Sequence, residues 1–280
     1  NPYRGCSHAC TYCFARVTHT YMDMNAGRDF ESKIVVKVNA PELLRAKLRS
    51  RSWKGEHIAM GTATDPYQRA EGRYRLMRGI IAALSEYGNA FSILTKGTLI
   101  LRDLDLLCAA AERTEVSAAF SIGTLDETAW RNSEPGTPHP RKRMEAVAKL
   151  NDSGIPCGVM VAPILPGITD GRGQLSAVIE AALEAKATHV TPILLHLRPG
   201  VREEYMGWLT SSYPGLVGDY ESMYTHSSYA PKAKRDALGN TVRALVQAAD
   251  PENALGARKK RWRDPKRAIP PKKTEQLSFL

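Results

Sequence analysis

The chain has 280 residues, of which 43% are hydrophobic, and its formal net charge at pH 7 is +10. This length suits one large globular domain or two small ones, and no apolar run reaches the roughly 18 residues that a membrane-spanning helix needs. The charge is uneven, because residues 256–280 hold nine Lys and Arg against two acids, a net +7, which leaves only +3 for the first 255 residues. The composition therefore predicts a near-neutral globular body followed by a basic arm.

The beginning of the chain and its cysteine usage indicate the cellular setting. The first residues, Asn-Pro-Tyr-Arg, are neither a signal peptide nor an initiator Met, so we expect the natural protein to begin upstream of Asn1. Three of the five cysteines fall within eight residues, while Cys108 and Cys157 stand alone in apolar surroundings. Disulfide frameworks spread paired cysteines along small secreted chains, so this pattern predicts a reducing cytoplasm.

The strongest chemical signal is the CxxxCxxC spacing of Cys6, Cys10 and Cys13. Three thiolates in one tight loop can ligate three corners of a cubane iron–sulfur cluster, which leaves the fourth iron open for a cofactor or substrate. Zinc is the alternative, with His8 or His19 as the fourth ligand. Structural zinc sites usually pair two-residue knuckles from separate segments, and a single CxxxCxxC loop fits that pattern poorly.

The middle of the chain alternates short apolar runs with segments of helical periodicity. The predicted strands are residues 57–61, 90–95, 116–122, 156–163 and 189–195. The predicted helices between and after them are residues 72–87, 102–112, 141–153 and 174–187. Strand and helix repeating at roughly 30-residue spacing predict βα units and an α/β fold with a parallel sheet.

The carboxyl ends of these strands are where we expect ligands to bind, as in parallel barrels and doubly wound sheets. After Pro199 the pattern changes: residues 201–212 and 231–248 read as helices, joined by a loop rich in Gly, Tyr and Ser. The predicted organisation is therefore a core over residues 1–199, a small helical C-terminal extension over 200–250, and a disordered basic tail over 251–280.

The cysteine motif, with Tyr12 before its last Cys and a βα series after it, resembles the radical S-adenosylmethionine superfamily. Within that superfamily the chain resembles the branch related to spore photoproduct lyase, often labelled DNA repair photolyase-like, from Asn1 to about Arg198. The segments that carry this likeness are NPYRGCSHACTYCFAR at 1–16, GTATDPYQ at 61–68, LTK at 94–96, FSIGTLDE at 120–127, EPGTPHPRKR at 134–143 and VAPILPGITD at 161–170. The resemblance implies a partial (β/α)6 barrel whose first strand immediately precedes the cysteine loop. Here that strand would lie before Asn1.

The same resemblance implies a [4Fe–4S] cluster on the three cysteines and S-adenosyl-L-methionine chelated at the open iron. In the family, aromatic residues at the positions of Tyr12 and Phe14 border the adenine, although simple loop packing explains them as well. Small polar groups at the end of the second barrel strand receive the methionine ammonium, a role that falls to Thr62 and Thr64 here. Asp65 adds a charged partner beside them.

Three further positions match cofactor contacts of the family. Lys96 ends the third barrel strand and corresponds to a lysine that contacts the cofactor carboxylate. Ser121 ends the fourth strand, at the position that contacts the ribose. Arg143 is a weaker candidate for the carboxylate or ribose, because its neighbours Arg141 and Lys142 resemble plain solvated charges.

One departure from the family limits the expected chemistry. In spore photoproduct lyase a cysteine near the end of the second strand returns a hydrogen atom to the product radical, and Thr62 stands at that position here. A hydroxyl O–H bond is too strong for such a donor. Cys108 falls mid-helix and Cys157 at the start of a strand, and both fit small buried hydrophobes better than donors. Thymine-dimer repair by that route is therefore not expected.

The basic arm suggests two partners. Trp262 stands among its charges, a pattern that suits contact with a nucleic-acid backbone and stacking on bases, although a solubilising tail explains it equally well. The peptide Gln276–Leu280 resembles the short motifs by which bacterial DNA-processing proteins bind the sliding clamp.

Three functions remain open at this point. The first is a radical enzyme that acts on nucleic acid and takes its electron from a reductant such as flavodoxin or ferredoxin. The others are a DNA-binding iron–sulfur protein without radical catalysis, and a radical enzyme that acts on a small metabolite or a peptide.

Overall fold

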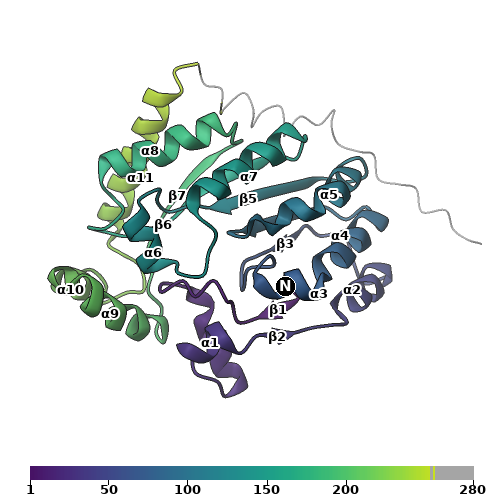
Figure 1. Ribbon diagram of the computed structural model, residues 1–280, viewed down its shortest axis with the longest axis horizontal. Helices are drawn as coiled ribbons and strands as arrows, with labels where there is room; N and C mark the ends of the chain where they lie inside the picture. Colours follow the sequence, from purple (N-terminus) through teal and green to yellow (C-terminus); the bar gives the residue numbers. More distant parts are fainter. Residues whose placement is uncertain (253–254, 256–280) are drawn as a thin grey trace, which may run out of the picture.

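A five-stranded parallel sheet forms the centre of the computed structural model, which describes residues 1–252 and 255 (Figure 1). The strands neighbour one another in chain order, and Phe91 aligns with Ile58 on one side and with Val116 on the other. Their bounds are β3 Ile58–Met60, β4 Phe91–Thr95, β5 Val116–Ser121, β6 Cys157–Ile164 and β7 Val190–Leu194. These bounds lie within the predicted apolar runs apart from one residue of β6, so the predicted α/β fold with a parallel sheet is confirmed.

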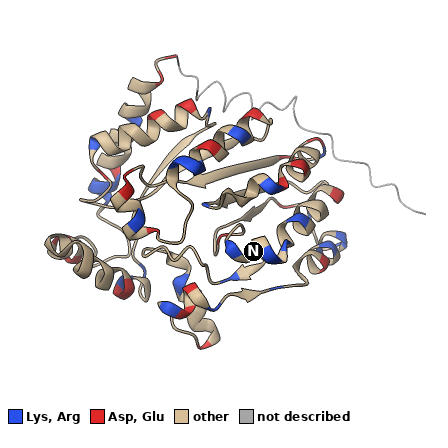
Figure 2. Ribbon diagram, in the orientation of Figure 1, with Lys and Arg blue, Asp and Glu red and all other residues tan. Residues whose placement is uncertain are grey.

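Helices connect the strands and pack on the sheet. Those that match predicted helices are α3 Arg69–Tyr74, α4 Leu76–Glu86, α5 Leu104–Ala111, α7 Pro140–Asp152, α8 Arg172–Glu184, α9 Val201–Ser212 and α11 Lys232–Ala249. A short 3₁₀ helix, η2 (Thr98–Asp103), leads into α5. Charged side chains of both signs lie on the helices and loops, whereas β3 to β7 carry none (Figure 2). Uncharged strands are what a sheet packed between other elements requires.

The helix predicted over residues 72–87 is in fact two helices, because the chain turns at Arg75 between α3 and α4. Arg75 adopts a left-handed conformation with φ 52°. The buried carboxylate of Glu71 accepts hydrogen bonds from the backbone N–H groups of Leu76 at 3.0 Å and Met77 at 3.1 Å. These bonds satisfy donors that the first turn of a helix leaves unpaired, so Glu71 starts the second helix where periodicity alone predicts continuity.

Several short elements were not predicted. They are β1 Tyr3–Arg4, η1 Phe14–Met22, α1 Arg28–Ser32, β2 Val35–Val36, α2 Ala40–Arg49, α6 Glu127–Ser133, η3 Pro214–Leu216 and α10 Val217–Met223. The last two lie in the segment predicted as a loop between α9 and α11. Strands β1 and β2 form a separate antiparallel pair of two residues each. Elements as short as β1, β2 and η3 carry too little periodicity to be recognised from sequence.

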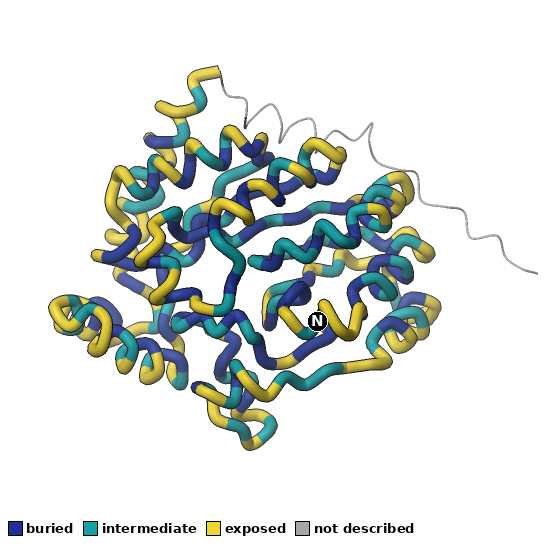
Figure 3. The backbone as a smooth tube through the Cα atoms, in the orientation of Figure 1, coloured by how far each residue is buried: buried dark blue, intermediate teal, exposed yellow. Residues whose placement is uncertain are grey.

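The main hydrophobic core lies between the sheet and its helices. Phe91, Phe120, Val159 and Ile179 are fully buried in it. Figure 3 shows that buried residues concentrate in the middle of the molecule and exposed residues on its outer helices and loops. A second cluster, built around Tyr205, contains residues of α9, α10 and the segments that follow β6 and β7. The cysteine loop contributes Cys10 and Tyr12 to this second cluster, so α9 and α10 are anchored beside the loop.

The structure divides the predicted extension over residues 200–250 into two parts. Helix α11 packs on α8 and β7, and its residues Val242 and Leu245 belong to the main core. Helices α9 and α10 instead belong to the second cluster. The arm at 256–280, with its Gln276–Leu280 peptide, lies outside the described residues, and no helix in the described part is long and apolar enough to cross a membrane.

The strand expected before Asn1 stays a prediction. Within the described residues β3 is an edge strand of the parallel sheet, and a cavity of about 440 Å³ lies beside it. Ile58 and Met60 of β3 and Ile80 of α4 line this cavity.

Candidate active site

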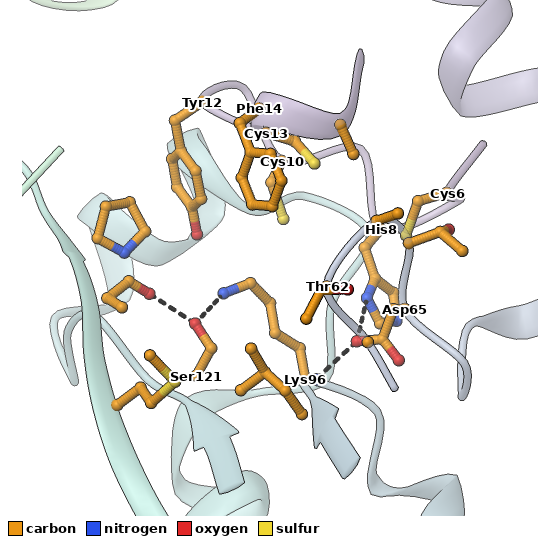
Figure 4. Close-up of a pocket in the computed structure, with 18 of the residues that line it drawn as sticks. Cys6, His8, Cys10, Tyr12, Cys13, Phe14, Thr62, Asp65, Lys96 and Ser121 are labelled. Carbon is orange, nitrogen blue, oxygen red and sulfur yellow. Dashed lines mark hydrogen bonds and ion pairs between the residues drawn. The ribbon is translucent and has the colours of Figure 1, made fainter. Parts of the chain in front are cut away.

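The three motif cysteines lie on an irregular loop between β1 and η1. Backbone hydrogen bonds from Ala9 to Cys6 (3.2 Å) and from Cys13 to Cys10 (3.3 Å) fold this loop into two successive turns. The loop opens at Gly5 with φ +79°, where a Cβ atom would stand 2.8 Å from the carbonyl oxygen of Phe30, so this position requires glycine. The tight turns bring all three thiols to one cavity (Figure 4).

Residues from distant parts of the chain hold the loop in this shape. Gln68 donates from Nε2 to the carbonyl of Gly5 (2.8 Å) and accepts from the backbone N–H of Ser7 (2.9 Å). The Oγ1 of Thr64 donates to the same Gly5 carbonyl at 2.6 Å. On the other side, the backbone N–H of Gly136 donates to the carbonyl of His8 at 3.0 Å. The loop conformation is therefore imposed by the segments that follow β3 and α6.

A buried guanidinium completes the support from within the N-terminal segment. Arg16 donates from Nε and Nη2 to the carbonyl of Cys10 at 3.1 and 3.0 Å. Its Nη1 reaches the carbonyl of Gly27, and its Nη2 forms an ion pair with Glu31 at 3.0 Å. Arg16 therefore ties the motif loop to α1 through donors that a lysine could not supply in the same plane.

The cavity has a volume of about 190 Å³ and lies at the carboxyl ends of the strands. Beside the three cysteines, it is lined by Thr62 and Thr64 after β3, Lys96 after β4 and Ser121 at the end of β5. Tyr12 and Phe14 line it from the cysteine loop, and Met160, Pro163 and His196 line it from β6 and from the segment after β7. The strand ends that the sequence singled out thus meet around one space.

The side chains of Lys96 and Ser121 are in contact at the wall of this cavity. The Nζ atom of Lys96 lies 2.5 Å from the Oγ of Ser121, which in turn donates to the carbonyl of Ala162 at 2.6 Å (Figure 4). The ammonium also lies 3.4 Å from the carboxylate of Glu134 and 5.6 Å from the ring centre of Tyr12. Lys96 is therefore a cation held among polar partners, with its end directed into the cavity.

Behind Lys96 lies a buried ionic cluster centred on Glu134. Its carboxylate accepts the hydroxyl of Tyr12 and forms an ion pair with Arg143 at 2.5 Å. Burial alone would raise the pKa of Glu134, but Arg143 and Lys96 outweigh burial and lower it to about 2. Burial and the Glu134 charge both raise the pKa of Tyr12, so the phenol stays a donor to the carboxylate.

Arg143 is not among the residues that line the cavity. Its side chain is fully buried, and it donates to the carbonyls of Pro138 (2.8 Å) and Ser121 (3.0 Å) and to the hydroxyl of Thr137 (2.5 Å). Together with Glu134, these partners engage the whole guanidinium. Arg143 therefore supports the end of β5 from behind, and the structure does not bring it to the predicted cofactor space.

A second ion pair joins the cysteine loop to the ends of β3 and β4. The Nδ1 of His8 lies 3.3 Å from the carboxylate of Asp65, which also accepts from the hydroxyl of Thr95 and the backbone N–H of Lys96, each at 2.6 Å. Burial opposes both charges, but their mutual attraction raises the pKa of His8 to about 10 and lowers that of Asp65 to about 2. This pair fixes the loop relative to the backbone of Lys96.

The remaining candidate residues differ in how far they are buried and in whether they line the cavity. Thr62 is exposed at the cavity, whereas the hydroxyl of Thr64 is buried and donates to Gly5. Phe14 is 39% exposed at the cavity mouth. Cys108 lies in α5 and Cys157 opens β6 in the main core, so neither belongs to the cavity.

The sequence assigns Glu134 no role of its own, places His196 only among the strand-end residues where ligands are expected, and offers His8 only as a zinc ligand. A signal for each was available. His8 stands inside the cysteine motif, Glu134 opens the EPGTPHPRKR segment, and His196 directly follows the last predicted strand. Each lacked a recognisable partner in sequence, because the groups they contact lie on other loops.

Comparisons with known proteins agree with this geometry. A family model described as the Radical SAM superfamily matches residues 1–175. An uncharacterised protein of Mycobacterium tuberculosis is 48% identical over 246 residues, which cover 88% of this chain and 72% of that protein. Spore photoproduct lyase of Bacillus subtilis is 27% identical over 194 residues, which cover 66% of this chain and 51% of the lyase.

Solved structures of spore photoproduct lyase share the fold. A cysteine-to-serine mutant aligns with a TM-score of 0.66 at 16% identity, covering 89% of this chain and 73% of the lyase. A mutant with bound AdoMet and dinucleoside spore photoproduct aligns with a TM-score of 0.64 at 15% identity and the same coverage. With the family model matching well over half of its length, the chain belongs to the radical SAM superfamily and is an enzyme of the radical SAM class.

Proposed function

We propose that this enzyme holds a [4Fe–4S] cluster on Cys6, Cys10 and Cys13, cleaves S-adenosyl-L-methionine to a 5′-deoxyadenosyl radical, and acts on nucleic acid. The observation that carries the proposal is that three thiols of one short loop share a single cavity with Lys96 and Ser121. A protein that only transfers electrons has no need of a cation and a hydroxyl aimed at the same space as its cluster ligands.

The donor set fits an iron–sulfur cluster. Burial raises the pKa of Cys10, and that of Cys13 to about 11, so both thiols stay protonated until a metal centre binds them. Of the histidines weighed as zinc ligands, His8 lines the cavity and pairs through Nδ1 with Asp65. His19 is not among the residues that line the cavity, and its Nε2 lies 3.0 Å from the carbonyl of Lys33.

The three thiols need not converge on one point. In the described part of the chain no group of three or more His, Cys, Asp or Glu side chains is arranged to hold a single metal ion. A cubane cluster takes one thiolate at each of three corners, so thiols spread around a cavity suit it better than they suit one zinc ion.

The residues around the cavity offer complementary partners for S-adenosyl-L-methionine. When bound, the cluster supplies one electron to the sulfonium, which breaks the bond between sulfur and C5′ and yields methionine and the radical. The ammonium of Lys96 would hold the methionine carboxylate, and the Oγ of Ser121 would contact the ribose. Thr62, exposed at the cavity, would receive the methionine ammonium, and Tyr12 and Phe14 would flank the adenine.

Two of the candidate cofactor-binding residues would support the site without contacting the cofactor. The hydroxyl of Thr64 donates to the carbonyl of Gly5. We therefore assign Thr64 to holding the cysteine loop rather than to contacting the methionine ammonium directly. Arg143 keeps the carboxylate of Glu134 ionised and oriented, and this carboxylate in turn contacts Lys96 and Tyr12. Several weak polar contacts fixed in this way hold a cofactor in one reactive position.

The nucleic-acid part of the proposal is supported by the likeness to spore photoproduct lyase, one structure of which holds a dinucleoside spore photoproduct. The nine basic residues of 256–280 would add affinity for phosphates. We further propose that flavodoxin or ferredoxin supplies the electron.

The test is anaerobic reconstitution of the full chain with iron and sulfide, followed by S-adenosyl-L-methionine and dithionite. We expect slow release of 5′-deoxyadenosine and methionine without substrate, and faster release with DNA, RNA or cell extract that contains the substrate. The variant Cys13→Ala is the matched control and should release neither product. A wild-type protein that binds iron but forms no 5′-deoxyadenosine would instead favour an iron–sulfur protein without radical catalysis.

A further inference from the structure

Three aromatic rings form a row that begins at the cavity wall and leads outward. The ring centres of Phe14 and His196 are 5.6 Å apart with an interplanar angle of 35°. Those of His196 and Tyr229 are 5.5 Å apart at 25°, a stacked pair. Phe14 and His196 line the cavity, and Tyr229 is 48% exposed. We call Phe14, His196 and Tyr229 the aromatic row.

The backbone fixes the outer pair of the row. His196 and Tyr229 face each other in an antiparallel bridge, and the adjacent backbone N–H of Leu197 donates to the carbonyl of Ser228 at 2.7 Å. Side chains directly opposite each other in such a bridge lie on the same face within contact distance. The two rings are therefore held in register by the chain on either side of α9 and α10, and the row is preformed.

Arginines stand at both ends of the row. The guanidinium of Arg198 lies 5.9 Å from the ring centre of Phe14, and that of Arg235 lies 5.7 Å from the ring centre of Tyr229. Both arginines are exposed, and Arg235 is oriented by a 3.1 Å hydrogen bond from its Nε to the carbonyl of Ala230. An exposed cation–π contact is weak, so either guanidinium can leave its ring for an anion at little cost.

The middle ring carries no charge at neutral pH. Burial and the neighbouring Arg198 both lower the pKa of His196 below its ordinary value. A neutral imidazole between two aromatic rings adds no charge of its own to the row, so the positive charge stays at the ends.

We propose that the outer end of the aromatic row, at Tyr229, is a stacking platform for a base of a single-stranded segment of nucleic acid, with Arg198 and Arg235 on its phosphates. The inference rests on the nucleic-acid substrate proposed above and assigns the surface that would recognise it. Every base has a π face, so exposed rings bind single strands with little sequence preference, while guanidinium groups neutralise the backbone between them. Because the inner end of the row lies at the cavity wall, a strand bound at Tyr229 would lie close to the cavity mouth.

The charge pattern favours a nucleic acid over an apolar peptide. A groove for an apolar peptide would be rimmed by aliphatic side chains, whereas this row ends in a cation on each side. Bases and phosphates alternate along a single strand with the same two chemistries, flat rings and negative charges.

The experiment measures binding of the full chain to two fluorescein-labelled probes of equal length: octathymidylate, and the same backbone with abasic sites in place of the bases. We expect Tyr229→Ala to weaken octathymidylate binding by about fivefold or more while changing abasic binding by less than about twofold. Tyr229→Phe should bind both probes as the wild type does. Arg235→Ala should weaken both probes, because the backbone carries the phosphates in each.

The chain offers a matched control away from the cavity. Tyr74 is 40% exposed and lies under the guanidinium of Arg73 at 5.4 Å, so Tyr74→Ala removes a similar ring and should leave both probes unaffected. Equal loss of both probes in Tyr229→Ala, or no loss, would overturn the platform. So would weaker binding of S-adenosyl-L-methionine together with unchanged octathymidylate binding, because the row would then belong to the cofactor site.

Failure of this inference is separable from failure of the proposed function. A wild-type protein that forms 5′-deoxyadenosine, together with a Tyr229→Ala variant that binds octathymidylate normally, overturns only the platform. Base-dependent loss in Tyr229→Ala together with a wild type that forms no 5′-deoxyadenosine supports the platform and overturns the radical chemistry.

Discussion

The Nζ atom of Lys96 and the Oγ atom of Ser121 lie 2.5 Å apart, so two side chains join the carboxyl ends of β4 and β5. Each has an additional partner, Glu134 at 3.4 Å for the ammonium and the carbonyl of Ala162 for the hydroxyl. A carboxylate that enters the cavity would therefore meet a cation already held in place, which lowers the entropy cost of binding it.

We expect Lys96→Ala to weaken binding of S-adenosyl-L-methionine by roughly tenfold or more while the cluster stays intact, because a hydrogen bond to a charged group is lost. Equilibrium dialysis of anaerobic, cluster-loaded protein measures this. The surface variant Lys142→Ala, whose side chain pairs with exposed Glu145 on the same helix, is the control and should bind normally. Unchanged affinity in Lys96→Ala would show that Lys96 does not contact the cofactor.

Anaerobic wild-type protein should bind about four iron and four sulfide per chain. Cys6→Ala, Cys10→Ala and Cys13→Ala should each abolish this binding, because a cubane held at three corners cannot spare a ligand. Cys108→Ala and Cys157→Ala should keep it, since neither thiol reaches the cavity. Iron and sulfide analysis with absorption spectra checks this, and stoichiometric zinc in a protein unable to take up iron would contradict it.

The wild type should not repair a thymine dimer through a cysteine hydrogen-atom donor. Thr62 lines the cavity at the position that the family resemblance assigns to the donor cysteine, Cys157 is fully buried in the core, and Cys108 lies 3.7 Å from the carbonyl of Ser153. Chromatography and mass spectrometry of anaerobic reactions would detect the repaired product. Efficient repair, with a thiyl radical traced to either remaining cysteine, would refute this prediction.

Acid should destabilise the protein partly through Glu134. Its pKa is about 2 in the folded chain against an ordinary 4.5, so its ionised form favours folding at all higher pH values, and this contribution is lost as pH falls from 4.5 through 2. The loss amounts to roughly 3 kcal/mol. Urea unfolding at pH values from 6 to 3 should show a shallower decline for Glu134→Gln than for the wild type.

The exposed residue Glu145 provides the comparison for this experiment. Glu145→Gln should follow the wild-type decline, because its partner Lys142 is exposed and solvent screens the pair. Glu134→Gln will also lower stability at neutral pH, since it leaves Arg143 buried without its counter-charge. The slope against pH, rather than the absolute stability, is therefore the quantity that decides. An unchanged slope would contradict the assigned ion pair.

Deletion of residues 256–280 should weaken nucleic-acid binding and flatten its salt dependence, because each neutralised phosphate releases condensed counterions. Formation of 5′-deoxyadenosine without nucleic acid should be unaffected. Gln276→Ala combined with Leu277→Ala should abolish binding to a bacterial sliding clamp yet spare DNA binding, since neither residue is charged. If the deletion changes neither interaction, the arm contributes nothing to recognition.

The sheet is well predicted because a buried parallel strand appears in the sequence as a short, continuous apolar run. The runs at 90–95 and 116–122 are apolar and bounded by turn residues, and both became strands with nearly the expected ends. The same reasoning located Lys96 and Ser121, since side chains at the carboxyl ends of neighbouring parallel strands must converge. Arg75 shows where it fails, because the turn there depends on a carboxylate cap at Glu71 that periodicity does not reveal.

The charged groups around the cavity were harder to predict for a related reason. Asp65 was expected to pair with a charge, but its partner proved to be His8, which lies in the cysteine loop. Glu134 opens one of the segments that carry the family resemblance, yet its role follows from its contacts with Tyr12 and Arg143, which the sequence does not reveal. Pairings between loops of different βα units depend on how those loops cross, and local sequence patterns carry no information about that crossing.

The cysteine loop has no regular structure of its own and takes its shape from Gln68, Thr64 and the backbone of Gly136. A short peptide copied from it would keep the ligands and lose their arrangement, so transplanting this motif into another scaffold would require importing its neighbours as well. If the loop holds a cluster as proposed, the capacity to retain iron would be a sensitive measure of whether the tertiary structure is intact. A variant with normal helix content but a loosened contact at Gln68 would be revealed by its colour before circular dichroism detected any change.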